Sequence, residues 1–146
     1  MFVVTGLGHS GTGWAAQLFS RLGVPCGHER WFNPWRQTPG GNDSSWLAVP
    51  HVDDLPAGWR IVHLVRDPLK VAQSYARQDN ERDYRGVSPW YVYAERHRPD
   101  MFTADTLVGR VIDRVAGWDA PLLDRDDVHR VRIEDCRDPE VAADMV

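Results

Sequence analysis

Residues 2–14 read Phe2-Val3-Val4-Thr5-Gly6-Leu7-Gly8-His9-Ser10-Gly11-Thr12-Gly13-Trp14, and this stretch predicts a strand, a tight glycine loop and the start of a helix. Apolar residues continue at helical spacing as far as Leu22. The loop glycines allow backbone angles that a Cβ would forbid. Loop N–H groups and the positive end of the new helix then converge on one point, so the sequence predicts an anion site, in the first place for a phosphate.

The residues that follow the loop argue against a nucleotide kinase. In ATP- and GTP-binding loops a Lys contacts the terminal phosphates, and the next residue, Ser or Thr, binds Mg²⁺. Thr12 and Gly13 stand in these two places. A sulfuryl group carries less negative charge than a phosphoryl group, so its transfer can proceed without a metal ion. A loop without this Lys and without a Mg²⁺ ligand therefore suits sulfuryl transfer better than phosphoryl transfer.

Length and composition limit the classes of protein to which the chain can belong. With 146 residues we expect one domain, residues 1–146. The net charge of -4 gives no general attraction to nucleic acid or to an anionic membrane. No apolar run is long enough to cross a membrane, and the N-terminus enters a strand without a basic leader. We therefore expect a soluble protein in the cytoplasm.

Cysteine and histidine spacing predicts no metal site. Cys26 and Cys136 form no Cys-x-x-Cys pair, and the six histidines show no ligand spacing. We expect two free thiols. The sequence leaves the oligomeric state open.

Further elements complete a prediction of an α/β fold with a mostly parallel sheet flanked by helices. Arg60 to Val65 predicts a buried parallel strand, followed by a helix from Pro68, and Val128 begins a last alternating strand. Two more helices are predicted over 89–97 and 103–118. The arginines at 96, 98, 110 and 114 are candidates for additional anion contacts, but they are assigned no role because exposed arginine is usually solvated. Residues 31–59 are predicted to be an irregular segment. Most of its tryptophans are expected to pin the segment to the domain, and the alternative is that they stack on a sugar, an aromatic acceptor or adenine. The charged run 78–86 is predicted to be surface or a flap.

Two stretches resemble the cofactor motifs of sulfotransferases that use 3′-phosphoadenosine 5′-phosphosulfate (PAPS). Residues Gly8-His9-Ser10-Gly11-Thr12-Gly13-Trp14 resemble the family's 5′-phosphosulfate loop. Residues Ile61-Val62-His63-Leu64-Val65-Arg66-Asp67-Pro68-Leu69-Lys70-Val71-Ala72-Gln73-Ser74-Tyr75 resemble its 3′-phosphate motif. Residues 128–140 resemble a later family strand, whose acidic residues Glu134 or Asp135 we expect to support the cofactor loop. The resemblance implies a three-layer P-loop fold.

The resemblance also implies residue roles. The 5′-phosphosulfate would bind Gly8, His9, Ser10, Gly11, Thr12 and Gly13, and the 3′-phosphate would bind Arg66 and Ser74. Asp67 is predicted to orient Arg66 or to cap the next helix. His9 stands where the family usually has Lys or Arg, and an imidazole stabilises the leaving phosphate only as a cation or as an N–H donor.

Gly27-His28-Glu29 resembles the segment that carries the catalytic base in several branches of the family. Glu29 is the first candidate for the base, and His28 the second. The alternative is that Glu29 forms a surface ion pair with Arg30 or another cation.

These observations predict a PAPS-dependent sulfotransferase that needs no metal and acts on a hydroxyl or amine of a sugar, a tyrosine or a small molecule. Two alternatives stay open. One is a nucleotide or small-molecule kinase with a degenerate P-loop. The other is a non-catalytic nucleotide-binding protein, which is favoured by His9 and by the lack, after Val146, of the family's basic C-terminal segment.

Overall fold

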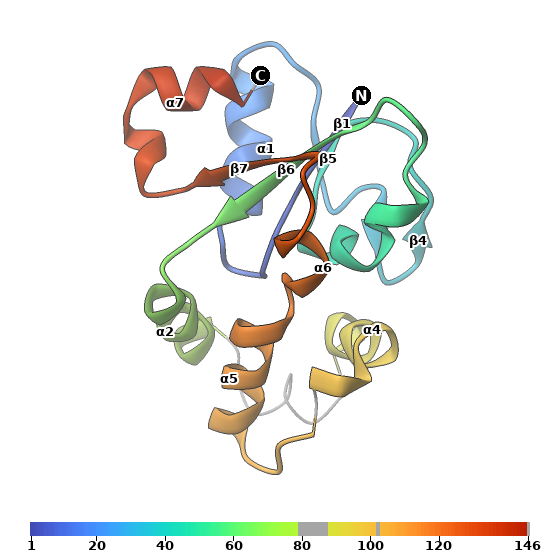
Figure 1. The fold of residues 1–146 in the computed structure, drawn as a ribbon, viewed down its shortest axis with the longest axis vertical. Helices are drawn as coiled ribbons and strands as arrows, with labels where there is room; N and C mark the ends of the chain where they lie inside the picture. The colour runs from blue at the N-terminus through green and yellow to red at the C-terminus, as the bar shows by residue number, and fades with distance from the viewer. Residues whose placement is uncertain (79–87, 102, 146) are drawn as a thin grey trace.

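A parallel sheet forms the centre of the fold (Figure 1). The computed structural model describes residues 1–78, 88–101 and 103–145. Within these ranges the sheet has the strand order β2-β5-β1-β6-β7, and its pairings are all parallel. The strands are β1 (Phe2–Thr5), β2 (Gly27–His28), β5 (Asp43–Ser44), β6 (Arg60–Val65) and β7 (Val128–Arg132). The predicted α/β class with a mostly parallel sheet is confirmed.

Helices cover both faces of this sheet. One face packs against α1 (Thr12–Arg21) and α7 (Pro139–Asp144). The other face is covered by the 3-10 helix η1 (Trp46–Asp54), α2 (Pro68–Gln78), α4 (Pro89–His97), α5 (Leu107–Gly117) and α6 (Ala120–Leu123), with the short 3-10 helix η2 (Pro99–Met101). A further 3-10 turn, η3 (Asp135–Arg137), precedes α7. In Figure 1, α2, α4 and α5 lie together, beyond the end of β6.

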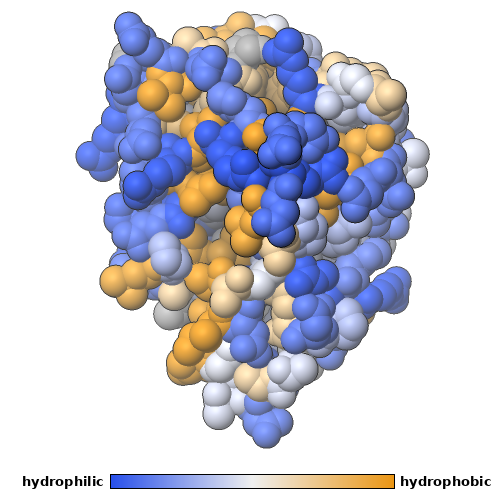
Figure 2. Space-filling view, viewed as in Figure 1, coloured by the Kyte–Doolittle hydropathy of each residue, from blue (hydrophilic) through white to orange (hydrophobic). Residues whose placement is uncertain are grey.

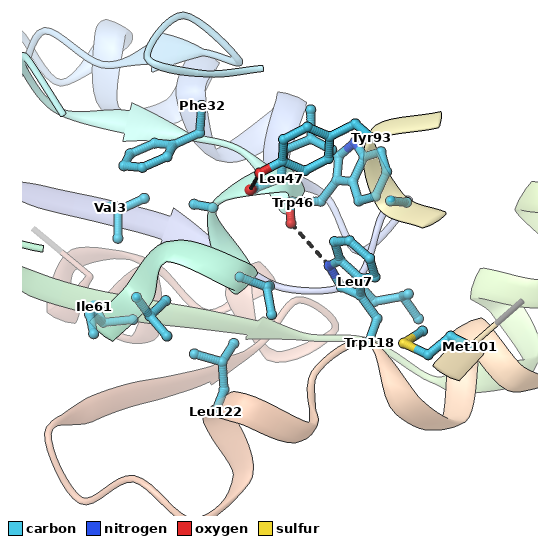
Figure 3. Packing of buried hydrophobic residues seen from close by; sticks show 14 of the residues in the cluster. Val3, Leu7, Phe32, Trp46, Leu47, Ile61, Tyr93, Met101, Trp118 and Leu122 are labelled. Carbon is cyan, nitrogen blue, oxygen red and sulfur yellow. Dashed lines mark hydrogen bonds between the residues drawn. The ribbon is translucent and has the colours of Figure 1, made fainter. Parts of the chain in front are cut away.

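Strand alternation divides the apolar residues between two cores. Val3 and Ile61 belong to the core beneath η1, whereas their neighbours Val4 and Val62 pack against α1, because successive strand side chains point to opposite faces. In the first core the Trp118 indole donates a hydrogen bond of 3.0 Å to the Trp46 carbonyl (Figure 3). Both indoles are thereby buried with the N–H of Trp118 satisfied.

The irregular segment predicted between Trp31 and Trp59 is the main error in the sequence-based prediction. It contains β5, which lies inside the sheet between β2 and β1, as well as η1 and an antiparallel hairpin of β3 (Phe32–Asn33) and β4 (Arg36–Gln37). β5 is only two residues long, and both are polar, so it lacks the apolar pattern that identifies a buried strand.

Element boundaries also differ slightly from the prediction. The helix expected from residue 103 begins at Leu107, because the Thr106 hydroxyl caps it by accepting the Gly109 N–H at 3.1 Å. The charged run 78–86 lies outside the described residues, apart from the backbone of its first residue. No helix in the described ranges is long and apolar enough to span a membrane. Figure 2 shows a surface on which hydrophobic patches are interspersed with hydrophilic residues.

Candidate functional site

The glycine loop lies where the order of strands reverses. From β1 the chain runs to β2 and β5 on one side, and it then crosses to β6 and β7 on the other. In open parallel sheets this switch point, at the carboxyl ends of the strands, forms the ligand crevice. The close packing of the loop requires glycine at positions 6 and 8. A Cβ on Gly6, whose φ is 150°, would meet the Leu64 carbonyl, and one on Gly8 would meet the Tyr75 hydroxyl.

The start of α1 faces this loop without a side-chain cap. Gly11 is the N-cap residue, with a left-handed φ of 112°, and it has no side chain that could accept the first N–H groups of the helix. The Ser10 side chain is buried, and its hydroxyl has no hydrogen-bond partner in the described part of the chain. The loop therefore presents unsatisfied donors and the positive end of a helix at one place.

A cleft of about 550 Å³ opens beside the loop, within the size range of small-molecule sites. Most of the residues predicted for the site line it: Gly8, His9, Gly11, Thr12, Gly13, His28, Glu29, Arg66 and Ser74. Ser10 is the exception, because it is buried behind the loop. The fold thus brings together His28 of β2 and residues from the segments that follow β1, β2 and β6.

Arg66 and Ser74 meet the loop at His9. The Arg66 guanidinium donates a hydrogen bond of 2.7 Å to the His9 carbonyl, and His9 Nδ1 lies 3.0 Å from the Ser74 hydroxyl. His9 has a left-handed φ of 65°, and its ring lies against Tyr75 with a centroid distance of 4.1 Å. These contacts hold an unfavourable backbone conformation beside the cleft.

The helix after Arg66 begins with a predicted cap. The Asp67 carboxylate accepts the N–H of Leu69 at 2.8 Å, which confirms the capping alternative for Asp67. Glu134 accepts the N–H of Asp67 at 3.3 Å and lies 3.5 Å from the Lys70 ammonium. The acidic residue after β7 thus supports the segment that carries Arg66.

Glu29 is a largely buried carboxylate in the cleft. Its side chain is 16% exposed, and its backbone has a left-handed φ of 52°. Burial is the main cause that raises the pKa of Glu29, and the Asp43 carboxylate raises it further. His28, at 3.7 Å, and hydrogen bonding from the Trp46 side chain lower this pKa. The predicted alternative was an ion pair of Glu29 with Arg30 or another cation. In the described structure the partner within ion-pair distance is His28, when it is protonated, and not Arg30.

Several residues that line the cleft were not assigned to the site by the sequence analysis. Trp46, Tyr75, Trp90, Tyr91 and Arg114 line it together with the loop. They come from η1, α2, α4 and α5, and only the tertiary fold brings these elements together. Their spacing within each helix is typical of ordinary core packing, so a pattern-based prediction does not separate them from structural residues.

A second cleft, of about 420 Å³, adjoins the first at Gly11 and Arg66. It is lined by Trp14, by the cationic side chains of Arg66, Lys70 and Arg137, and by the carboxylate of Glu134. The loop therefore has an aromatic and cationic surface on one side and the Glu29 cleft on the other.

Neither of the two thiols lines the cleft that contains Glu29. Cys26 and Cys136 are free, and burial raises the pKa of the Cys26 thiol to about 12. A thiol that stays protonated at neutral pH is neither a nucleophile nor a metal ligand. The described residues contain no cluster of three or more His, Cys, Asp or Glu that could hold a metal ion.

Comparisons of the chain with protein-family models, with curated proteins and with solved structures find no match. Its function must therefore be inferred from the geometry of the site and from the motifs in the sequence.

Proposed function

We propose that this chain is a P-loop sulfotransferase that uses PAPS and transfers its sulfuryl group to a hydroxyl or amine of an acceptor. One observation carries the proposal. The glycine loop, Arg66, Ser74 and the carboxylate of Glu29, which are far apart in the sequence, line one cleft at the switch point of a parallel sheet.

The residues present fit the anionic groups of PAPS. Gly11, the N-cap residue of α1, has no side chain that could accept the first N–H groups of the helix, and it lines the cleft. Thr12, Gly13 and the start of α1 would hold the 5′-phosphosulfate through N–H and hydroxyl donors. The guanidinium of Arg66 and the hydroxyl of Ser74 would bind the 3′-phosphate.

The chemistry then needs one proton acceptor and one group that stabilises negative charge. PAPS supplies the sulfuryl group, which the acceptor oxygen or nitrogen receives as the bond to the 5′-phosphate breaks. Glu29 takes the proton of the acceptor hydroxyl or amine, and its raised pKa brings its basicity closer to that task. The loop amides and a His9 N–H stabilise the negative charge that develops on the phosphate. His28, beside Glu29, is the second candidate for the base.

The first experiment is calorimetric titration with 3′-phosphoadenosine 5′-phosphate (PAP), the desulfated product, without metal. We expect Arg66→Ala to weaken binding about 10- to 100-fold and Ser74→Ala about 3- to 10-fold, as for charged and neutral hydrogen bonds. Arg60→Ala and Ser20→Ala are matched controls, because Arg60 is exposed at the other end of β6 and the Ser20 hydroxyl bonds the Ala16 carbonyl.

Three outcomes overturn the proposal or part of it. Absence of PAP binding removes the PAPS assignment. A preference for ATP with Mg²⁺ indicates a kinase with a degenerate loop. Tight PAP binding without turnover on a broad panel of hydroxyl and amine acceptors indicates a non-catalytic nucleotide-binding protein.

A further inference from the structure

Arg114 is a buried cation in the wall of the cleft. It lies on α5, the residue is 6% exposed, and it lines the same cleft as the glycine loop. Its guanidinium carbon lies 4.6 Å from the ring centroid of Trp46 and 4.8 Å from that of Tyr75. The two aromatic rings therefore hold the guanidinium in place.

No carboxylate of the described residues forms an ion pair with this guanidinium. Its Nε is buried, without a hydrogen-bond partner in the same part of the chain. Asp113, the adjacent residue of the helix, does not pair with it either, because neighbouring helical side chains point in different directions. Other partly buried arginines do have partners: Arg98 pairs with Asp100, and Arg125 with Asp53 and Asp127.

An unpaired buried cation is costly, and cation–π contacts offset only part of that cost. Because arginine keeps its charge in a protein, the site cannot avoid this cost by deprotonation. A guanidinium held in such a position is suited to bind an oxyanion, which supplies both the missing charge and the missing hydrogen-bond acceptors.

The neighbours of Arg114 place this anion between Glu29 and His9. Trp46, on which Arg114 stacks, also acts on the Glu29 carboxylate through a hydrogen bond. Tyr75, the other ring beside Arg114, lies against the His9 ring. An anion at Arg114 would therefore lie near both the group that takes the acceptor proton and the glycine loop.

We propose that Arg114 binds a negatively charged group of the acceptor, a carboxylate, sulfate or phosphate carried on a ring. The ring is inferred from Trp90, the aromatic residue of this cleft whose side chain is only partly buried, on which a flat ring or a sugar can stack. That this molecule is an acceptor rests on the proposed function, whereas the anion site at Arg114 does not. The substrate class is then an acidic, ring-containing hydroxyl or amine compound.

The test compares two probes that differ in charge, 4-hydroxybenzoate and 4-hydroxybenzamide, by NMR titration of the full chain with and without PAP. We expect the wild type to bind the benzoate at least about tenfold more tightly, the ratio typical of one charged hydrogen bond. Arg114→Met keeps the packing of the stem between the rings, and it should abolish this preference while leaving the melting temperature unchanged or higher. Arg114→Lys should retain part of the preference, and Arg96→Gln, on the exposed side of α4, should retain it fully.

Each result separates the anion site from the sulfotransferase proposal. Equal affinity for the two probes, or no binding of either, overturns the inference. A loss of PAP affinity of about tenfold or more in Arg114→Met also overturns it, since Arg114 would then be a ligand of the nucleotide. If PAP does not bind but the benzoate preference depends on Arg114, the anion site stands and only the sulfotransferase proposal falls.

Discussion

The basicity of Glu29 depends on a few identifiable neighbours. Burial raises its pKa above the usual 4.5, and His28 lowers it through its positive charge. We predict that the titration of the Glu29 carboxyl carbon, followed by ¹³C NMR, has its midpoint above 4.5, and that His28→Asn moves it higher still. In the proposed reaction the Glu29 carboxylate is the base, and that proposal predicts that transfer activity falls as the pH decreases through this midpoint.

A control variant separates the effect of His28 from a general change in charge. His129 is also partly exposed and also lies beside a carboxylate, Asp144, but it is on β7. His129→Asn should therefore leave the Glu29 midpoint where it is in the wild type. A wild-type midpoint at or below 4.5 would mean that burial does not dominate the titration of Glu29.

Single residues were predictable where a motif places them directly after a strand. Arg66, Glu29 and the loop glycines lie at carboxyl ends of strands, and all of them except Gly6 line the cleft. Arg114 was not predictable, because nothing in its local sequence distinguishes it from Arg110. Its burial results from Trp46 and Tyr75, which belong to other elements.

At the scale of elements, Asp43 holds the segment that follows β2. Its side chain is fully buried, and its carboxylate accepts the N–H groups of Arg30, Trp31 and Phe32 at 3.1, 2.9 and 3.1 Å. Those residues come directly after Glu29, so one carboxylate on β5 fixes the turn that carries the candidate base. These three hydrogen bonds also explain why β5, a buried two-residue strand, contains an acidic residue.

We predict that Asp43→Asn lowers the free energy of unfolding by about 3 kcal/mol, measured by urea denaturation. The amide would place an NH₂ donor against N–H donors, which leaves buried groups unsatisfied. Asp126→Asn, at an exposed position before β7, is the matched control and should change stability by less than about 0.5 kcal/mol. Equal stability of the two variants would mean that Asp43 does not hold the turn.

The long apolar elements were predictable, and the short polar ones were not. β1, β6 and α1 follow from their apolar spacing, and the structure has them close to the expected positions. Where β5 and η1 lie, the sequence pattern predicts irregular chain because proline and glycine are frequent there. The three hydrogen bonds to Asp43 and the contact of Trp46 with Trp118 are long-range features that no local pattern contains.

At the scale of the whole molecule, a histidine and tyrosine cluster joins η1 to α4. His51 Nε2 lies 2.5 Å from the Tyr93 hydroxyl. The Tyr93 hydroxyl donates a hydrogen bond of 2.8 Å to the Leu47 carbonyl (Figure 3). Burial is the main cause that lowers the pKa of both His51 and His97, and Asp54 only partly opposes it at His51. These two elements form the layer that closes one side of the cleft.

The lowered pKa values of these histidines predict a loss of stability in mild acid. Between the folded-state pKa and the unfolded value of 6.5, the unfolded chain binds more protons, so stability rises with pH in this window. The contribution is complete above 6.5, and it decreases as the pH falls through the folded-state pKa, with a slope of at most about 1.4 kcal/mol per pH unit for each histidine.

Urea denaturation at a series of pH values should show this slope, and His51→Gln should reduce it because glutamine does not titrate. His129→Gln, at a partly exposed position on β7, should retain the full slope. A wild-type stability that stays constant or increases as the pH falls below 6.5, together with identical profiles for the two variants, would show that the cluster is not the acid-sensitive part of the fold.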